Sequence, residues 1–281
     1  MFNKLNDDEK HFAIFIAKAA LSENLATILK HSNCIISLSE NEQISFNNIC
    51  ECVTPALQSV SRSIDTETIL RLYIADKCNS FALAMPLDHN NKHNRSPRAY
   101  VMYDHAAYFN HSCLPNCVRI DEINDVHSNN IKYSDAKSQS FTNPPSMIIQ
   151  ALSDISPGTE LTISYVPLDT EYGLRSQRLR TEYGFDCDCE RCVIERFINI
   201  SNDEIDDENC RLQMIAQSIY LVKYSCTKCG GTLCPISGSS DQKCNVCGII
   251  RTEQEFKSVL DAEFNDSDSE MSDNISGDED L

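Results

Sequence analysis

The chain has 281 residues, 41% of them hydrophobic, and a formal net charge of -18 at pH 7. This length and apolar content suffice to bury a core, and they exclude a protein that is disordered throughout. The 42 acidic residues outweigh the 24 basic ones, which argues against direct nucleic-acid binding and favours a basic protein partner.

The N-terminal segment and the cysteine usage indicate the cellular compartment. Asp7, Asp8 and Glu9 precede the first apolar stretch, a charge opposite to that of a signal peptide, and no run of about 18 apolar residues is present to cross a membrane. The 15 cysteines fall mostly into C-x-C and C-x-x-C groups, which favour metal binding over disulfides. We therefore expect the protein in the nucleus, the cytoplasm or both.

Three helices are predicted in a helical N-terminal region, residues 1–77. The first is capped at Asn6 or Asp7 and carries apolar residues at helical spacing from Phe12 to Ala20. The first half of this helical pattern ends near Lys30. The second and third follow the periodic sets Phe46, Ile49, Val53, Ala56, Leu57 and Ile69, Leu72, Tyr73, Asp76.

Short strands alternate with polar loops in the middle of the chain. Strands are predicted at 81–85, 147–151 and 161–165, loops at 89–97 and 124–145, and a short basic helix at 175–183. An acidic break follows at 203–208. The tail at 263–281 is rich in Asp, Glu and Ser and is expected to be disordered, because it has almost nothing apolar to offset the entropy of ordering.

The first candidate metal site combines two distant segments. Cys187, Cys189 and Cys192 supply three thiolates within six residues, which leaves one position open on a tetrahedral zinc ion. Cys113, at the end of the sequence Asn110-His111-Ser112-Cys113, is the natural fourth ligand. A structural zinc ion is worth roughly 10 kcal/mol or more of apparent folding free energy, enough to fix a segment with little core of its own.

The second candidate metal site is a zinc ribbon. Cys226 and Cys229 form one C-x-x-C-G knuckle, and Cys244 and Cys247 form another. A glycine after each pair lets the backbone adopt a positive φ and turn its amides toward the sulfurs. Cys234, inside the ribbon, could compete as a ligand, and a disulfide pairing is the weaker alternative.

Three segments in order resemble the SET domain of lysine methyltransferases and its post-SET segment, most closely in the SET and MYND branch. They are Asn110–Asn116, Gly158–Tyr165 and Tyr183–Cys189, and Cys78–Phe81 also resembles that branch. The resemblance implies an α+β fold containing the C-terminal half of a SET β-fold. It implies an insert-SET-like helical region at 1–77, the SET core at 78–168, a post-SET zinc-binding segment at 169–200 and the ribbon at 220–252.

The resemblance also implies roles for individual residues. Asn110 and His111 would bind S-adenosylmethionine, assisted by Asn79 and Ser80, and Phe185 would contribute to the same pocket. Tyr165 would be the catalytic tyrosine that orients the substrate amine. Tyr183 and Phe185 would line the lysine channel, where aromatic walls favour the neutral amine.

The sequence also departs from the SET pattern. It has no glycine before Gly158, so the glycine-rich cofactor strand of the N-terminal SET half is missing, and no MYND finger is found. We expect a fragment of a longer product, a chain in which the helical region substitutes, or an inactive descendant. The leading hypothesis is a methyltransferase that uses S-adenosylmethionine and two Zn²⁺ ions on a histone or other basic protein. The alternative is a non-catalytic zinc-binding adaptor.

Overall fold

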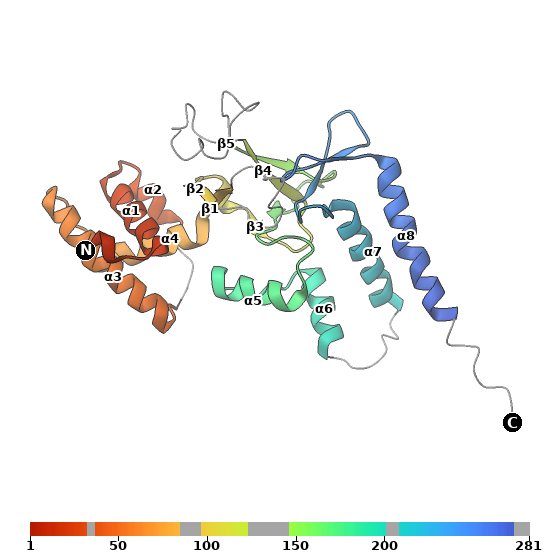
Figure 1. The fold of residues 1–281 in the computed structure, drawn as a ribbon, viewed down its shortest axis with the longest axis horizontal. Helices are drawn as coiled ribbons and strands as arrows, with labels where there is room; N and C mark the ends of the chain where they lie inside the picture. The colour runs from red at the N-terminus through yellow and green to blue at the C-terminus, as the bar shows by residue number, and fades with distance from the viewer. Residues whose placement is uncertain (33–36, 85–96, 123–145, 201–207, 273–281) are drawn as a thin grey trace. The chain divides into compact units, whose positions relative to one another are not determined.

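The computed structural model describes residues 1–32, 37–84, 97–122, 146–200 and 208–272 (Figure 1). The chain forms two compact units, one of residues 1–85, 96–109 and 173–186, and one of residues 86–95, 110–172 and 187–281. This division differs from the predicted one, which assigned residues 78–109 to the SET core. The predicted loops at 89–97 and 124–145 and the acidic break lie outside the described residues, except that Pro97 begins β2 and Glu208 begins α7.

The first unit is mainly helical. It contains a short 3-10 turn (η1, Phe2–Lys4), α1 (Asp7–Leu21), α2 (Leu25–Lys30), α3 (Glu40–Ser59), α4 (Thr66–Asn79) and α5 (Tyr172–Tyr183, in this unit from Gly173). The three predicted helices are confirmed, but the first is divided by Ser22–Asn24 into α1 and α2. None of the described helices is both long and apolar enough to span a membrane.

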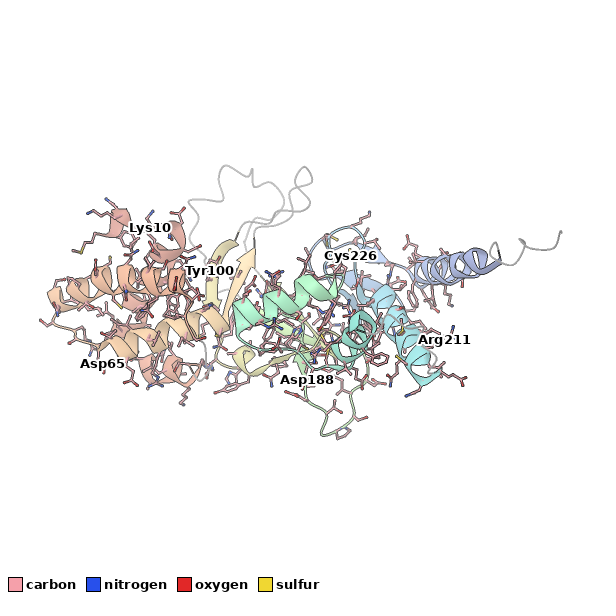
Figure 2. All side chains as sticks on the ribbon, turned by 90° about the horizontal axis from the view of Figure 1, so that it is seen from below. Lys10, Asp65, Tyr100, Asp188, Arg211 and Cys226 are labelled. Atoms are coloured by element: carbon pink, nitrogen blue, oxygen red, sulfur yellow. The ribbon has the colours of Figure 1, made fainter. Side chains whose placement is uncertain are left out.

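Side-chain caps explain where these helices begin. Asn6 and Ser39 each form a capping box, with Glu9 and Glu42 respectively, and the Asp65 side chain (labelled in Figure 2) accepts from the N–H of Thr68. The apolar faces then share one core, in which Ile16, Ile49, Leu72 and their neighbours are almost fully buried. Burial of these faces, rather than helix propensity, stabilises such short helices.

A small antiparallel sheet completes the first unit. β1 (Ser80–Ala84) was predicted, and it pairs with β2 (Pro97–Met102), with Phe81 opposite Val101. The strand β2 was not predicted, because its sequence follows the polar loop and begins with proline. A 3-10 turn (η2, Ala106–Tyr108) ends this segment.

The second unit contains two strand pairs that hold the candidate site. β3 (Asn110–His111) is parallel to β6 (Thr162–Ile163), and β4 (Cys117–Glu122) is antiparallel to β5 (Ser146–Ala151). The strand predicted at 161–165 pairs only through Thr162 and Ile163. It ends there because Ser164 Oγ donates to Val166 O at 2.6 Å and the Tyr165 N–H bonds to a histidine ring instead of a strand partner.

The C-terminal part consists of α6 (Glu190–Ile200), α7 (Glu208–Tyr224), a three-stranded sheet of β7 (Leu233–Pro235), β8 (Gln242–Cys244) and β9 (Ile250–Arg251), and α8 (Glu253–Ser272). Tyr224 and Cys234 share a buried cluster with Val118, Leu152 and Leu168. The Tyr224 hydroxyl donates to Leu152 O at 3.0 Å. The three-stranded sheet therefore packs on the β4–β5 pair as part of one core.

The last helix extends into the segment that was expected to be a disordered tail. Residues 263–272, expected to be disordered, continue α8, and only 273–281 lie outside the described residues. The helix starts at a capping box in which Thr252 and Glu255 exchange hydrogen bonds, and Lys257 pairs with Glu253 at 2.7 Å. These local interactions favour helix formation at the start of α8.

Candidate functional site

Asn116 fixes the segment Asn110–Asn116, called the Asn110 turn below, which carries the predicted cofactor residues Asn110 and His111. Its Nδ2 donates to Glu160 O at 2.7 Å, and its Oδ1 accepts from the N–H of Thr162 at 2.9 Å. The amide of Asn110, an exposed residue, donates to Glu160 Oε1 at 2.6 Å. No role was predicted for Asn116 or Glu160, although both lie in the segments that carry the resemblance. Because the contacts span 44 to 50 residues of sequence, spacing gave no signal for them.

His111 lies between the first cysteine cluster and Tyr165. Its Nδ1 accepts a hydrogen bond from the backbone N–H of Tyr165 at 3.0 Å, and its Nε2 is 3.2 Å from Cys113 Sγ. The rings of His111 and Tyr165 also contact each other, with centroids 5.2 Å apart. The structure thus brings the predicted His111, Cys113 and Tyr165 together in one unit.

The first predicted set of cysteines forms a compact cluster. The sulfurs of Cys113, Cys187, Cys189 and Cys192 lie within 4.8 Å of one another, and Cys113 Sγ is 3.9 Å from Cys187 Sγ and 3.5 Å from Cys192 Sγ. A tetrahedral zinc ion with bonds of about 2.3 Å holds its sulfurs about 3.8 Å apart, so the set fits zinc.

The environment of this cluster favours a bound cation. Hydrogen bonds from Cys113 lower the pKa of Cys189, whereas burial raises the pKa of Cys187 to about 12. Thiolates crowded in a buried site repel one another, so a divalent cation is needed to stabilise all four in the deprotonated form.

The second predicted set forms a cluster of the same kind. The sulfurs of Cys226, Cys229, Cys244 and Cys247 lie within 4.8 Å of one another, with Cys226 and Cys247 at 3.7 Å and Cys229 and Cys244 at 3.5 Å. These distances exclude disulfides and fit zinc. Cys226 is labelled in Figure 2.

The glycines of the ribbon adopt the conformations that the knuckles require. Gly230 and Gly248 have φ of 67° and 70°, as predicted for the position after each cysteine pair. The N–H groups of Val246 and Cys247 point at Cys244 Sγ, at 3.4 and 3.5 Å. Such amide donors stabilise the charge on a metal-bound sulfur.

Cys234 does not belong to the ribbon cluster. It is 3% exposed, packs in the core shared with Leu152 and Tyr224, and donates to Thr232 O at 3.6 Å. Burial raises its pKa to about 11. The cysteines that cluster in the ribbon are therefore the four of the two knuckles, and Cys234 lies outside their group.

The remaining predicted residues belong to the first unit. Asn79 Nδ2 donates to His31 O at 2.8 Å and to Ala75 O at 3.3 Å, and the hydroxyl of Ser80 donates to Asp76. Asn79 thus holds a helix end in this structure. Tyr183 and Phe185 are half-buried, Tyr183 at the end of α5 and Phe185 just after it.

A cavity of about 450 Å³ in the first unit is lined by Ser80 and Tyr183, together with Asp8, Glu42, Asp76, Glu182, Lys77 and the rings of His11, Phe12 and Tyr100. Asp76 is 2% exposed, and its carboxylate is 2.8 Å from His11 Nε2. The hydrogen bond to Asp76 raises the pKa of His11. Acidic groups outnumber basic ones on this wall, so the cavity favours cationic groups.

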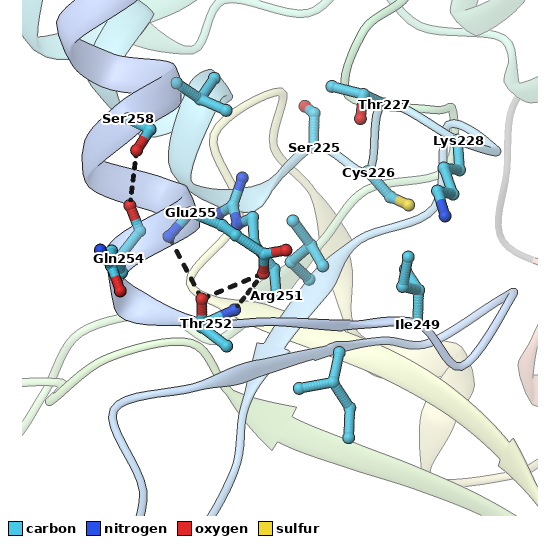
Figure 3. A pocket seen from close by; sticks show the side chains of 13 residues that line it. Ser225, Cys226, Thr227, Lys228, Ile249, Arg251, Thr252, Gln254, Glu255 and Ser258 are labelled. Atoms are coloured by element: carbon cyan, nitrogen blue, oxygen red, sulfur yellow. Dashed lines mark hydrogen bonds between the residues drawn. The ribbon is translucent and has the colours of Figure 1, made fainter.

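A second cavity of about 610 Å³ lies between the ribbon and the start of α8 (Figure 3). Several of its polar groups serve the fold: Thr252 and Glu255 cap α8, and Ser258 Oγ donates to Gln254 O at 3.1 Å. The guanidinium of Arg251 donates to Val222 O at 2.7 Å and to Lys223 O at the end of α7. These contacts connect the ribbon to both flanking helices.

Comparison with known proteins places this site in a family. A family model of the SET domain matches residues 2–166, more than half of the chain. The histone-lysine N-methyltransferase ASHR2 of Arabidopsis thaliana is 29% identical over 260 residues, covering 79% of this chain and 61% of that protein. A SET and MYND domain-containing protein of Dictyostelium discoideum is 32% identical over 154 residues, covering 52% and 26%. The histone-lysine N-methyltransferase SMYD1 of Homo sapiens is 28% identical over 132 residues, covering 47% and 24%.

The chain therefore spans between 24% and 61% of the length of these relatives. The SET match begins at residue 2 and includes the N-terminal helices, the Asn110 turn and Tyr165, whereas the C-terminal cysteines lie beyond it. With more than half of its residues matched, this chain belongs to the SET domain family.

Proposed function

We propose that the protein is an S-adenosylmethionine-dependent protein-lysine methyltransferase. The observation that carries the proposal is that, in a SET family chain, the Asn110–His111 turn, Tyr165 and a four-cysteine cluster are joined by direct contacts. Relatives named as histone-lysine N-methyltransferases support the same activity.

The Asn110 turn suits the cofactor's charge. S-adenosylmethionine supplies an electrophilic methyl group and carries positive charges on its sulfonium and amino groups. Asn110 is exposed, and the carboxylate of Glu160 lies 2.6 Å from its amide nitrogen. A carboxylate favours the cationic groups of the cofactor, and the carboxamide can exchange hydrogen bonds with it. We propose that Asn110, His111, Asn79, Ser80 and Phe185 are the cofactor-binding residues.

Tyr165 is proposed as the catalytic residue and Tyr183 and Phe185 as the walls of the lysine channel. Methyl transfer to an amine is an in-line displacement, so the residues contribute by aligning the amine and excluding water. The phenol of Tyr165 can orient the lysine nitrogen without being consumed. Apolar aromatic walls favour the neutral amine, which is the nucleophile.

The proposed substrate is a histone or another basic protein. The chain carries a formal net charge of -18, and Tyr183 faces a cavity with four carboxylates on its wall. A basic segment is attracted to such a surface. With such a substrate, the protein would act in the nucleus, the cytoplasm or both.

The test is transfer of labelled methyl groups from the cofactor to core histones by the full chain. Transfer should be lost in Tyr165→Phe and kept in Tyr108→Phe, whose side chain is exposed and contacts the ring of His31. Calorimetry should detect cofactor binding to wild type and Tyr165→Phe, and weaker binding to Asn110→Ala. Absence of transfer and of cofactor binding in a zinc-loaded protein would contradict the proposal.

The second candidate is a non-catalytic zinc-binding adaptor. It is favoured by one observation: the ribbon, α8 and the cavity between them lie beyond the SET match and contain none of the residues proposed for methyl transfer. For this candidate, zinc analysis would give two ions per chain while calorimetry detects no cofactor binding. The same two measurements thus separate the candidates.

A further inference from the structure

The side chain of His111 has both ring nitrogens occupied by groups of the protein. Nδ1 lies 3.0 Å from the backbone nitrogen of Tyr165, and Nε2 lies 3.2 Å from Cys113 Sγ. These two partners are the proposed catalytic residue and a member of the first cysteine cluster. The ring is half-buried, so water competes little for either nitrogen.

The chemistry of the two partners fixes the tautomer. A backbone N–H can only donate, so Nδ1 must accept and carries no proton. The remaining proton of a neutral imidazole is then on Nε2, which donates to the sulfur of Cys113. A zinc-bound thiolate is a good acceptor for this bond, and a hydrogen bond to a ligand atom is a common way to orient a metal site.

We infer that His111 is a positioning residue that couples the first cysteine cluster to Tyr165. Through Nδ1 it holds the backbone of Tyr165, and through the ring contact at 5.2 Å it limits the rotamers of the tyrosine side chain. With both nitrogens engaged, any contact of His111 with the cofactor comes from its backbone. The catalytic consequence of this inference rests on the proposed function, whereas the hydrogen bonds themselves do not.

Cadmium NMR on the full chain tests the bond to the cluster directly. With ¹¹³Cd in place of zinc, each four-cysteine cluster gives its own signal, and a ring N–H that donates to a metal-bound sulfur shows a scalar coupling to the metal. We expect a coupling between the His111 ring proton and one of the two cadmium signals. The signal of the second cluster is an internal control for folding and loading. Absence of the coupling, with both signals present, overturns the inference.

Two substitutions of His111 each keep one of its two hydrogen bonds and remove the other. The amide nitrogen in His111→Gln is as many bonds from Cβ as Nε2 and can still donate to Cys113. The side-chain oxygen in His111→Asn is as many bonds from Cβ as Nδ1 and can still accept from Tyr165. The first-cluster cadmium signal should therefore remain near its wild-type position in His111→Gln and shift in His111→Asn. His105→Gln, a change at an exposed histidine, is the matched control and should shift neither signal.

Kinetics then test the coupling to the active site. Each of the two variants, His111→Gln and His111→Asn, should lower kcat by about 10- to 100-fold, the usual effect of removing a group that supports a metal ligand. Full activity in His111→Asn would show that the cluster bond has no effect on Tyr165 and would refute the coupling. If wild type itself transfers no methyl groups, the proposed function fails. The cadmium measurement still decides whether His111 donates a hydrogen bond to Cys113.

Discussion

Gly231 offers a sharp test of the packing around the second cysteine cluster. A Cβ added at this position would lie 2.7 Å from Cys244 Sγ and 2.8 and 2.9 Å from Val246 Cβ and Cγ2. The φ of Gly231 is not positive, so Gly231→Ala introduces a steric clash without backbone strain. Cys244 is a cluster member and Val246 packs against the cluster, so neither can move away freely.

The expected cost follows from this clash. Overpacking a well-packed site costs about 1–3 kcal/mol, and because the clash is with a metal ligand, we expect most of it as weaker metal binding, roughly 5- to 150-fold at the second cluster. The assay is competition with a chelator on the full chain, followed by the separate ¹¹³Cd signals of the two clusters. The first cluster should keep its affinity.

Gly173→Ala is the matched control for this prediction. A Cβ at Gly173 meets no atom within 4 Å, and the residue lies in α5 without a positive φ. Alanine there should be neutral or stabilising by up to about 1 kcal/mol, with both metal affinities unchanged. If Gly231→Ala binds metal at the second cluster as tightly as wild type, the packing described for the ribbon is incorrect.

Three further predictions follow from other contacts. Cys113→Ala should lower the zinc content from two ions to one per chain, as measured by elemental analysis of the purified protein. The hydrogen bond to Asp76 raises the folded-state pKa of His11, so the stabilisation by this pair should be full below the ordinary pKa of 6.5 and be lost as the pH rises through the raised value. Urea unfolding of wild type and His11→Asn across this range should therefore give free energies of unfolding that converge at high pH. Tyr224→Phe should destabilise the second unit by about 1 kcal/mol, since Leu152 O loses its buried donor, and thermal unfolding should detect this.

The sequence alone determined the elements that depend on near neighbours. The capping box at Asn6, the apolar spacing of α3 and α4, and the positive φ of Gly230 are set by residues within a few positions of one another. The eight cluster cysteines could also be assigned, because the geometry of a tetrahedral metal restricts which spacings can share an ion. Even the prediction that Cys113 joins Cys187 at one ion followed from counting the ligands, because a tetrahedral ion needs a fourth cysteine beside the three of the post-SET segment.

The tertiary structure decided which distant groups meet. Asn245 Nδ2 donates to Arg119 O across 126 residues of sequence, and this contact helps to seat the ribbon on the β4–β5 pair. The early end of β6 and the position of His111 between Cys113 and Tyr165 likewise depend on a parallel pairing of two-residue strands. Periodicity and spacing report on the face of an element but not on its partner, because the partner is selected by the burial and hydrogen bonding of the whole chain.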